Sequence, residues 1–234
     1  DYISIKKNKG VSYALNMGLK KSRGKYVCWL SHDDIFSKNK LSEQIKCLKN
    51  KNVIVSSNFI EINSLNSLQK KKVLPQNYYD RTTLSLMIND RLNGCTLLIP
   101  KILIKKIGYF DEKLLHTQDY DMWIRLSRKF KFVHCEKFLL KMRIHKRQSS
   151  KIGKFQAQIE KKALFEKYYN YIKSDVEKLS IFNFFYYEAI LLRKEMTNAS
   201  DQILNTYIKN KPKIISIFFI ICFFLLKQIF KFIK

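Results

Sequence analysis

The sequence lacks any paired-cysteine motif. Its five cysteines are odd in number, scattered along the chain, and form no C-x-x-C pair. Most lie in apolar stretches, which argues against a disulfide framework and against a structural zinc site. We therefore expect buried, reduced thiols of a cytosolic protein. The chain also lacks internal repeats and any low-complexity tract beyond a bias toward lysine.

Acidic residues are scarce. The 234 residues include 45 lysines and arginines against 19 aspartates and glutamates, a formal charge of +26. Such an excess suggests anionic partners, namely nucleotide diphosphates, anionic lipid or nucleic acid. Lysine, asparagine, isoleucine, phenylalanine and tyrosine are abundant together, however, which AT-rich coding sequence also produces without selection for binding. Because the basic residues are spread evenly and form no known nucleic-acid motif, we expect no nucleic-acid partner.

No apolar run reaches the roughly 20 residues that a membrane-spanning helix needs. The most apolar stretch, residues 214–226, is flanked by lysines and followed by a mixed apolar and basic end. This pattern predicts that residues 212–234 form a membrane-associating helix attracted to anionic headgroups. A tilted span and a buried core helix are the alternatives. We expect a cytoplasmic protein that is peripheral or C-terminally anchored at the inner face of the membrane.

The sequence does contain a short apolar stretch, residues 26–30, which follows Gly24 and runs into Asp33 and Asp34. A run bounded in this way is typical of a strand buried on both faces of a parallel or mixed α/β sheet. Ligands of such sheets collect at the carboxyl ends of the strands. Adjacent carboxylates there suit Mg²⁺ or Mn²⁺, which in turn hold phosphates. The alternative is a turn and helix cap, which aspartate also favours.

The remaining pattern predicts alternating helices and strands up to about residue 150 and helices from residue 154 onward. The other expected strands are residues 53–62, 95–99, 130–134 and 138–144. The expected helices are residues 11–19, 39–49, 82–89, 101–107, 117–129, 165–172, 176–192 and 203–209. Pro100 suits the first turn of one helix and Gly108 its end. Residues 64–80 indicate an irregular, lysine-rich surface loop over a site.

Several motifs follow one another in a specific order. They are N-K-G-V-S-Y-A-L-N-M-G at 8–18, G-K-Y at 24–26, L-S-H-D-D at 30–34, N-G-C-T-L-L-I-P at 93–100, I-G-Y-F-D-E at 107–112, T-Q-D-Y-D-M-W-I-R-L at 117–126 and R-I-H at 143–145. Each motif alone is weak, but their order and spacing resemble the family 2 glycosyltransferases of the GT-A type. The resemblance covers roughly the first 150 residues and excludes the helical remainder.

The resemblance implies a GT-A-like (Rossmann-like) mixed α/β sheet flanked by helices, followed by a helical C-terminal extension. Residues 1–150 would form the glycosyltransferase domain without its first βαβ unit, residues 151–211 a helical extension, and residues 212–234 the membrane-associating helix. The family's opening strand, with the acid that grips the nucleotide base, is missing. Since the sequence begins at Asp1, we expect a fragment or processed chain that is inactive alone or needs its missing segment.

The resemblance also implies a role for each site residue. Ser31 replaces the first acid of the family's Asp-x-Asp motif, which leaves Asp33 as the metal ligand. Asp119 occupies the position of the general base, where a carboxylate takes the proton of an attacking sugar hydroxyl. The implied metal ligands (Mn²⁺ or Mg²⁺) are Asp33, Asp34 and His145. The implied donor-binding residues are Asn8, Gly10, Asn16, Asp33 and Arg143, and the implied acceptor-binding residues are Asp121 and Trp123.

Plainer interpretations compete with several of these roles. Asp119 and Asp121 could simply complement a helix dipole, Trp123 could belong to the core, and His145 could be a solvated loop histidine. The other three histidines are interpreted as structural or exposed.

The expected function is an inverting glycosyltransferase that moves a sugar from a nucleotide-diphosphate sugar to a saccharide or lipid-linked acceptor in cell-envelope synthesis. It would be hexosyltransferase-like and metal-dependent. One alternative is a non-catalytic basic protein that binds nucleic acid or membrane. The other is a nucleotidyltransferase, against which the motif at 117–125 argues.

Overall fold

The computed structural model describes residues 2–48, 52–74, 82–88, 92–146, 148, 153–179, 184–185, 191, 197–209 and 213–232. Contacts divide the chain into two compact units. The first consists of Asp1–Thr82 with Asn89–Glu160, and the second of Thr83–Ile88 with Lys161–Lys234. The three-part division expected from the sequence stays a prediction.

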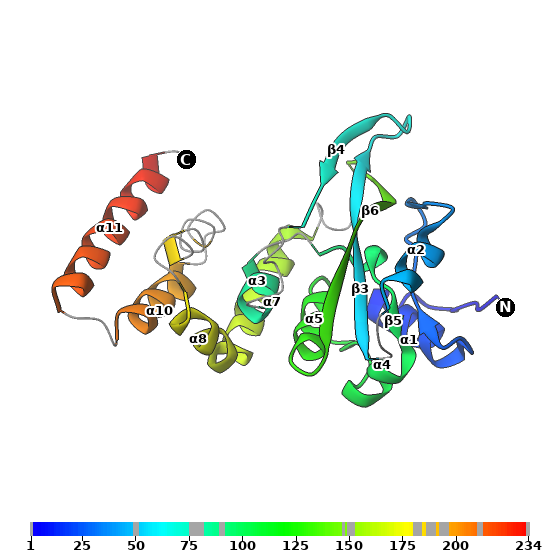
Figure 1. Ribbon diagram of the computed structural model, residues 1–234, viewed down its shortest axis with the longest axis horizontal. Helices are drawn as coiled ribbons and strands as arrows, with labels where there is room; N and C mark the ends of the chain where they lie inside the picture. The colour runs from blue at the N-terminus through cyan, green and yellow to red at the C-terminus, as the bar shows by residue number, and fades with distance from the viewer. Residues whose placement is uncertain are drawn as a thin grey trace. The chain divides into compact units, whose positions relative to one another are not determined.

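The first unit is built on a mixed four-stranded sheet with the order β2-β6-β3-β4 (Figure 1). Its strands are β2 (Ile35–Phe36), β3 (Val53–Ile62), β4 (Leu68–Lys72) and β6 (Lys131–Arg143). The two central strands, β3 and β6, run parallel, while the edge strands β2 and β4 pair antiparallel with them. The first seven residues of β3 are all buried, as expected for a central strand covered on both faces.

Strand β6 departs from the sequence pattern. Two strands were expected, residues 130–134 and 138–144, but the structure forms one strand, Lys131–Arg143. Ser57 of β3 pairs with Cys135, and the next residue, Asn58, pairs with Phe138. Glu136 and Lys137 are therefore extra residues of a β-bulge, which interrupts the alternation without ending the strand.

Two short strands, β1 (Tyr26–Val27) and β5 (Ile99–Pro100), pair antiparallel beside the main sheet, and a bridge from Leu98 to Val55 connects this pair to β3. The expected strand at residues 26–30 is thus shorter and is not parallel. The expected strand at 95–99 begins instead as a 3-10 turn, η1 (Gly94–Thr96), because the Asn93 side chain accepts a hydrogen bond from the Cys95 N–H.

Helices cover the sheet as the sequence predicts. In the first unit they are α1 (Val11–Lys21), α2 (Lys40–Lys46), α4 (Lys101–Ile107) and α5 (Gln118–Ser127), and Figure 1 shows α5 on one side of β3 and β6 and α1 and α2 on the other. Gly108 ends α4 at a φ of 90°, a left-handed conformation that favours glycine. Pro100 caps α4 rather than occupying its first turn. The segment expected to be a loop at 64–80 contains strand β4, and residues 75–80 lie outside the described residues.

The C-terminal part is helical, as expected. Its described helices are α7 (Lys154–Lys167), α8 (Tyr169–Glu177), α10 (Thr197–Ile208) and α11 (Lys213–Phe232). Helix α7 begins in the first unit, up to Glu160, and continues in the second, to which α3 (Thr82–Ile88) supplies most of its length. Most of the helix expected at 176–192 lies outside the described residues. The predicted fold class, a mixed α/β sheet flanked by helices and followed by a helical extension, is confirmed.

Helix α11 has one packed side. Phe219 and Phe223 are buried, and Phe219 lies against the rings of Phe184 and Tyr207. The side chains of Ile221, Phe224 and Leu225 are exposed. No helix of the described ranges is both long and apolar enough to cross a membrane. One face of α11 is therefore packed, as the buried-helix alternative expects. Membrane association through the exposed face stays a prediction.

Gly94 offers a sharp test of the packing in the first unit. A Cβ atom at Gly94 would lie 2.4 Å from Cζ2 of Trp29 and 3.1 Å from Cζ2 of Trp123. We expect Gly94→Ala to lower the free energy of unfolding by about 1–3 kcal/mol, because overpacking displaces neighbouring groups. Gly18→Ala is the matched control, since nothing lies within 4 Å of its Cβ position in α1. It should raise stability by about 0.5–1 kcal/mol. Chemical denaturation measures the free energy of unfolding of both variants. Equal changes in the two would contradict the close packing around Gly94.

Candidate active site

Asp33 and His145 meet at the end of the segment that follows β1. The Asp33 Oδ2 and His145 Nε2 atoms are 2.7 Å apart, although the residues are far apart in sequence. Burial raises the pKa of Asp33, the hydrogen bond to His145 lowers it, and the balance lies below the usual range. Asp33 is therefore a carboxylate at neutral pH, and its partner is the histidine that the late R-I-H motif singled out.

Arg143 joins two loops at this place. Its backbone N–H donates to Asp34 Oδ1 at 3.0 Å, and its Nε donates to the Asp33 carbonyl at 3.0 Å. The guanidinium also donates to the Asn63 carbonyl at 2.8 Å and to Asn66 Oδ1 at 2.8 Å. Here Arg143 positions the Asp33 loop and the β3–β4 turn. Its expected contact with the donor stays a prediction.

The neighbouring carboxylate, Asp34, has a different environment. Burial raises the pKa of Asp34, while the hydrogen bond from the Arg143 N–H opposes this, and the balance lies above the usual range. The Asp34 carboxyl faces Arg143 and Cys95 rather than His145. Asp34 thus fixes the loop, and its expected role as a metal ligand stays a prediction.

The residues present fit a divalent cation with two protein ligands. Asp33 offers a carboxylate oxygen and His145 an imidazole nitrogen at the same point. Within the part of the chain that the structure describes, no three His, Cys, Asp or Glu side chains gather as metal ligands. One protein carboxylate, here that of Asp33, suffices for Mg²⁺, which keeps several waters and uses substrate phosphates as further ligands.

Helix α1 holds the segment that leads to α5. Asn16 is buried: its side chain accepts from the Phe110 N–H at 2.9 Å and donates to the Phe110 carbonyl at 3.0 Å and to Glu112 Oε1 at 2.8 Å. Ser12 donates to the Leu114 carbonyl at 3.1 Å. Asn16 therefore holds the backbone of Phe110 and the side chain of Glu112. Its expected role in donor binding stays a prediction.

Asn8 and Gly10 shape the turn that precedes α1. The Asn8 side chain accepts from the Gly10 N–H at 2.9 Å, and Gly10 has a φ of 88°. Both residues lie outside the core. Their expected part in donor binding stays a prediction.

Helix α5 carries three of the expected residues in different surroundings. Asp119 is half-buried in the first turn, where its Oδ1 accepts from the Tyr120 N–H at 2.9 Å. Asp121 is only 1% exposed and accepts from Arg125 Nε at 2.8 Å. Arg125 in turn donates to the carbonyls of Ile107, Gly108 and Tyr109. Asp121 thus orients an arginine that holds a loop, and its expected contact with the acceptor stays a prediction.

Trp123 belongs to an interior aromatic cluster. It is 1% exposed and stacks on Trp29 with ring centroids 5.5 Å apart and 10° between the planes. Phe110 meets both indoles edge-on. The burial of Trp123 favours the core alternative, and its expected contact with the acceptor stays a prediction. The stack also packs α5, the helix that contains Asp119, against the segment that precedes Asp33.

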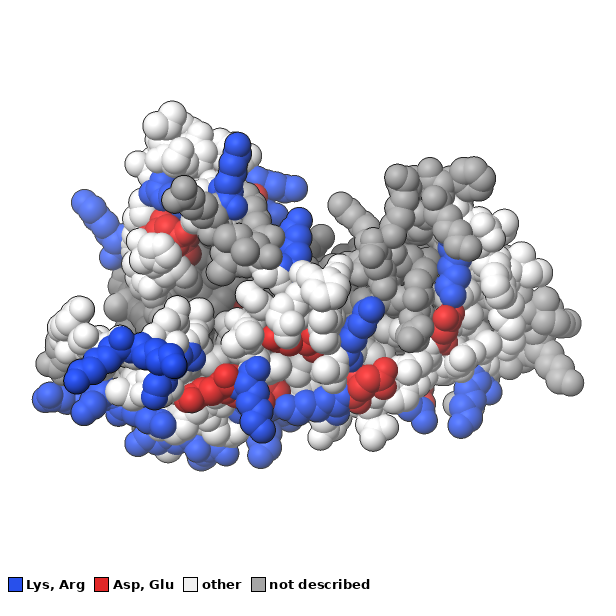
Figure 2. All heavy atoms as spheres, turned by 180° about the vertical axis from the view of Figure 1, so that it is seen from behind, with Lys and Arg blue, Asp and Glu red and all other residues white. Residues whose placement is uncertain are grey.

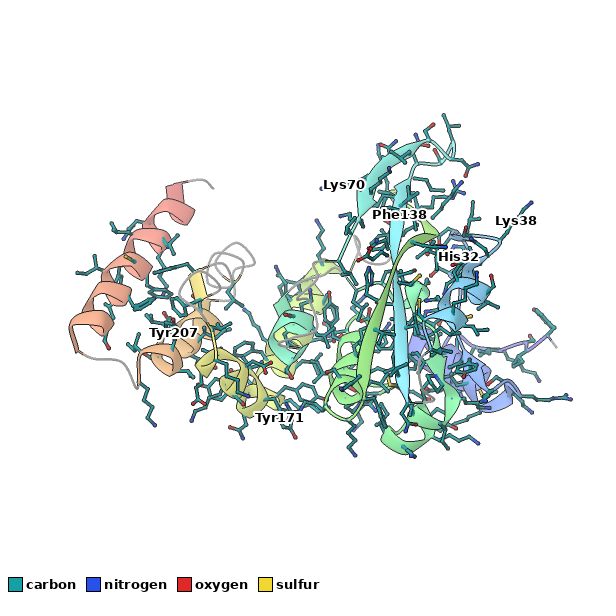
Figure 3. All side chains as sticks on the ribbon, in the orientation of Figure 1. His32, Lys38, Lys70, Phe138, Tyr171 and Tyr207 are labelled. Atoms are coloured by element: carbon teal, nitrogen blue, oxygen red, sulfur yellow. The ribbon has the colours of Figure 1, made fainter. Side chains whose placement is uncertain are left out.

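The remaining histidines are structural or exposed, as the sequence indicates. The ring of His134 lies between Ser56 Oγ, at 2.8 Å, and Asn58 Oδ1, at 2.9 Å, and so bridges two positions of β3. The side chain of His32 is 94% exposed, and Figure 3 shows it on the Asp33 loop. His116 lies against Gly153, where any side chain would collide with its ring.

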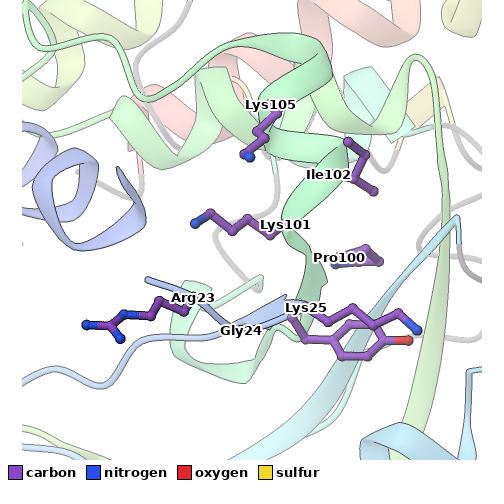
Figure 4. Close-up of a pocket in the computed structure, with 8 residues that line it drawn as sticks. Arg23, Gly24, Lys25, Pro100, Lys101, Ile102 and Lys105 are labelled. Carbon is purple, nitrogen blue, oxygen red and sulfur yellow. The ribbon is translucent and has the colours of Figure 1, made fainter. Parts of the chain in front are cut away.

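A basic hollow lies at the other end of β1 (Figure 4). It has a volume of about 350 Å³ and is lined by Arg23, Lys25, Lys101 and Lys105 together with Gly24, Tyr26, Pro100 and Ile102. None of the expected site residues lines it. Figure 2 shows basic side chains over much of the visible surface, with acidic ones interspersed, so positive charge alone does not mark this hollow.

Two residues of the site were missed from the sequence. Trp29 supports Trp123, and its place four residues before Asp33 was a usable signal. Glu160 of α7 accepts hydrogen bonds from the segment before α5. It lies in a helical pattern outside every recognised motif, so no local signal singled it out.

Comparison with known proteins agrees with the motifs. The family described as "Glycosyl transferase family 2" matches residues 1–105. An uncharacterized glycosyltransferase of Rickettsia prowazekii is 40% identical over 152 residues, covering 62% of this chain and 48% of that protein. A beta-1,3-glucosyltransferase of Escherichia coli, WfgD, is 28% identical over 121 residues, covering 51% of this chain and 45% of that protein.

Among solved structures, Staphylococcus aureus TarS residues 1–349 aligns with a TM-score of 0.49 at 15% identity, covering 88% of this chain and 54% of that one. The chain spans about half the length of the Rickettsia prowazekii and Escherichia coli proteins. The motif order and the family match agree: residues 1–105 are similar to the family described as "Glycosyl transferase family 2".

Proposed function

We propose that this chain carries the catalytic site of an inverting, metal-dependent, hexosyltransferase-like glycosyltransferase. It would move a sugar from a nucleotide-diphosphate sugar to a saccharide or lipid-linked acceptor in cell-envelope polysaccharide or glycan synthesis. The observation that carries this proposal is the 2.7 Å contact between Asp33 and His145. It unites two motifs that lie at opposite ends of the family-like region, and at a point suited to a diphosphate-bound cation.

The leaving-group end of the site is assigned to Asp33 and His145. They would hold a Mn²⁺ or Mg²⁺ ion, which when bound stabilises the charge that develops on the departing diphosphate. Arg143 and Asp34 keep the Asp33 loop in place through the contacts described above. Asn8 and Gly10 would bind the donor from the turn before α1.

Asp119 is assigned the proton transfer. Its carboxylate would accept the proton of an acceptor hydroxyl while the hydroxyl oxygen bonds to the anomeric carbon and the bond to the nucleoside diphosphate breaks. A single displacement of this kind inverts the anomeric configuration. Asp119 is half-buried in the first turn of α5, and the buried pair of Asp121 and Arg125 fixes that helix to the preceding loop.

The acceptor and the location are proposed from the name of a relative and from the exposed face of α11. The Escherichia coli relative is named for a diphosphoundecaprenol-linked acceptor, which favours a lipid-linked acceptor here. The exposed side chains of Ile221, Phe224 and Leu225 on α11 favour contact with a membrane surface at its cytoplasmic side. We extend the proposal to both.

The test is a turnover assay with the complete protein, including any segment that precedes residue 1. It is incubated with a panel of nucleotide-diphosphate sugars and saccharide or lipid-linked acceptors, with Mn²⁺ or with a chelator, and release of nucleoside diphosphate is measured. We expect release that needs both an acceptor and the metal for one donor. No release with any donor, together with steeply salt-dependent binding to DNA or RNA, would instead favour the basic binding protein.

A further inference from the structure

Glu160, in α7, is surrounded by hydrogen-bond donors from one segment. Its Oε1 accepts from the Leu115 N–H at 3.0 Å, and its Oε2 accepts from the N–H groups of His116 and Thr117, both at 3.0 Å. The Thr117 hydroxyl donates to Oε2 as well, at 2.9 Å. One carboxylate thus satisfies three successive backbone N–H groups, an arrangement that favours an anion.

The burial and charge of Glu160 make this contact strong. The residue is 6% exposed. Burial raises the pKa of Glu160, the N–H groups of His116 and Leu115 lower it, and the balance lies below the usual range. The carboxylate is therefore charged at neutral pH, and hydrogen bonds to a charged acceptor are stronger than neutral ones.

The contact lies at the start of the helix that carries the proposed base. Thr117 is the N-cap residue of α5, but its side chain makes no cap hydrogen bond and donates to Glu160 instead. Asp119 follows two residues later. The position of the first turn of α5 therefore depends on a residue from α7 rather than on a local cap.

A second contact fixes the same segment to the start of α7. A Cβ atom at Gly153 would lie 2.0 Å from Cε1 of His116. The backbone at residue 153 therefore passes directly against the His116 ring, next to the three N–H groups that Glu160 binds. Residues 115–117 are thus held from the α7 side by both packing and charge.

We propose that Glu160 is a positioning residue for catalysis: it holds residues 115–117 so that Asp119 faces the acceptor hydroxyl. This inference rests on the proposed function. It also makes α7, which lies beyond the matched residues 1–105, part of the machinery that sets the rate. Glu160 does not touch substrate in this account, so its effect acts through Asp119 alone.

The test uses Glu160→Gln in the full chain, with Glu166→Gln as matched control. Glu166 lies in the same helix, and its carboxylate accepts from Gln202 at 3.4 Å on the surface. We expect Glu160→Gln to lower kcat about tenfold with the donor KM within about twofold of wild type, because the base is misplaced while donor contacts remain. Glu166→Gln should leave both parameters unchanged.

A double substitution separates positioning from general destabilisation. In the Asp119→Asn background, adding Glu160→Gln should lower kcat by less than about twofold, because the effects of residues that act as a unit are not additive. A further tenfold loss would show an independent structural role and overturn the proposal. Glu160→Asp keeps the charge with a shorter reach and should be intermediate; should Glu160→Gln fail to fold, this variant takes its place in the same cycle.

Amide hydrogen exchange gives a readout that needs no activity. In Glu160→Gln, protection should fall about tenfold or more at residues 115–117 and in the first turn of α5, with the central strands unchanged. Unchanged protection at residues 115–117 and in the first turn of α5 would overturn the proposal, whatever the activity of the variant. A complete wild-type protein that transfers no sugar contradicts the proposed function instead, which is a different result from unchanged amide protection.

Discussion

Asp119→Asn is expected to lower kcat by about 100- to 10,000-fold, the usual contribution of general acid–base catalysis. Asparagine has nearly the same shape and can still accept the Tyr120 N–H hydrogen bond that Asp119 accepts at 2.9 Å. It cannot take a proton from a sugar hydroxyl at neutral pH. The donor KM should therefore change little. Steady-state kinetics with the donor identified by the turnover assay measures both parameters.

Asp111→Asn is the matched control for this prediction. Asp111 lies in the loop before α5, and its Oδ1 accepts from the Lys113 N–H at 3.0 Å, which asparagine can also do. The control changes the charge by the same amount near the same helix. It should keep activity within about twofold of wild type. Full activity in Asp119→Asn, or an equal loss in Asp111→Asn, would remove Asp119 from the role of base.

Asp33→Ala is expected to have the second large effect. It removes the carboxylate that lies 2.7 Å from His145 and with it one of the two side chains suited to a cation. We expect kcat/KM to fall about 100-fold or more, equivalent to about 2.7 kcal/mol of lost transition-state stabilisation. The concentration of Mn²⁺ needed for half-maximal activity should rise in parallel. Binding of Mn²⁺ followed by electron paramagnetic resonance provides a measurement independent of turnover.

The neighbouring His32 supplies the control. Its side chain is 94% exposed and lies 3.9 Å from Asp33. His32→Gln should leave both Mn²⁺ affinity and turnover within about twofold of wild type, whereas His145→Gln should reproduce much of the Asp33→Ala effect. Turnover that survives a chelator in wild type would show that the site works without a metal, and the assignment of Asp33 would then be wrong.

The order of helices and strands could be predicted because it depends on local pattern. The buried run of β3, the glycine that ends α4 and the helical C-terminal part each leave a sequence signal. The continuity of β6 could not be predicted, since Glu136 and Lys137 break the alternation at a bulge whose pairing partner, β3, is far away in sequence. The segment at 26–30 was expected to be a strand buried on both faces of a parallel or mixed sheet, and only its short antiparallel pairing with β5 shows how it is placed.

Only part of the candidate site could be predicted, for a similar reason. The meeting of Asp33 with His145 was anticipated from the motifs. The loop contacts of Asn16 and Arg143 and the pairing of Asp121 with Arg125 were not, because the motifs mark these residues without showing their partners. A polar residue that holds a loop near a reaction centre and one that touches the substrate look alike in sequence. Burial and hydrogen-bond partners separate the two.

The hydrogen bonds around residues 107–117 give the candidate site a common physical basis. The segment from residue 107 to residue 117 has little regular structure, yet side chains satisfy its backbone groups from several directions. Arg125 binds the carbonyls at 107–109, Asn16 binds both groups of Phe110, and Glu160 binds the N–H groups at 115–117. A proton-transfer group must be held in a precise geometry to act. This network holds the start of α5 without a ligand.

The most direct test of the account is the anomeric configuration of the product. The full chain is incubated with the active donor and acceptor, and the configuration at the new bond is read by proton nuclear magnetic resonance at early times. A single displacement assisted by Asp119 predicts inversion relative to the donor. A product that retains the donor's configuration would contradict the direct attack of the acceptor and with it the central role of Asp119.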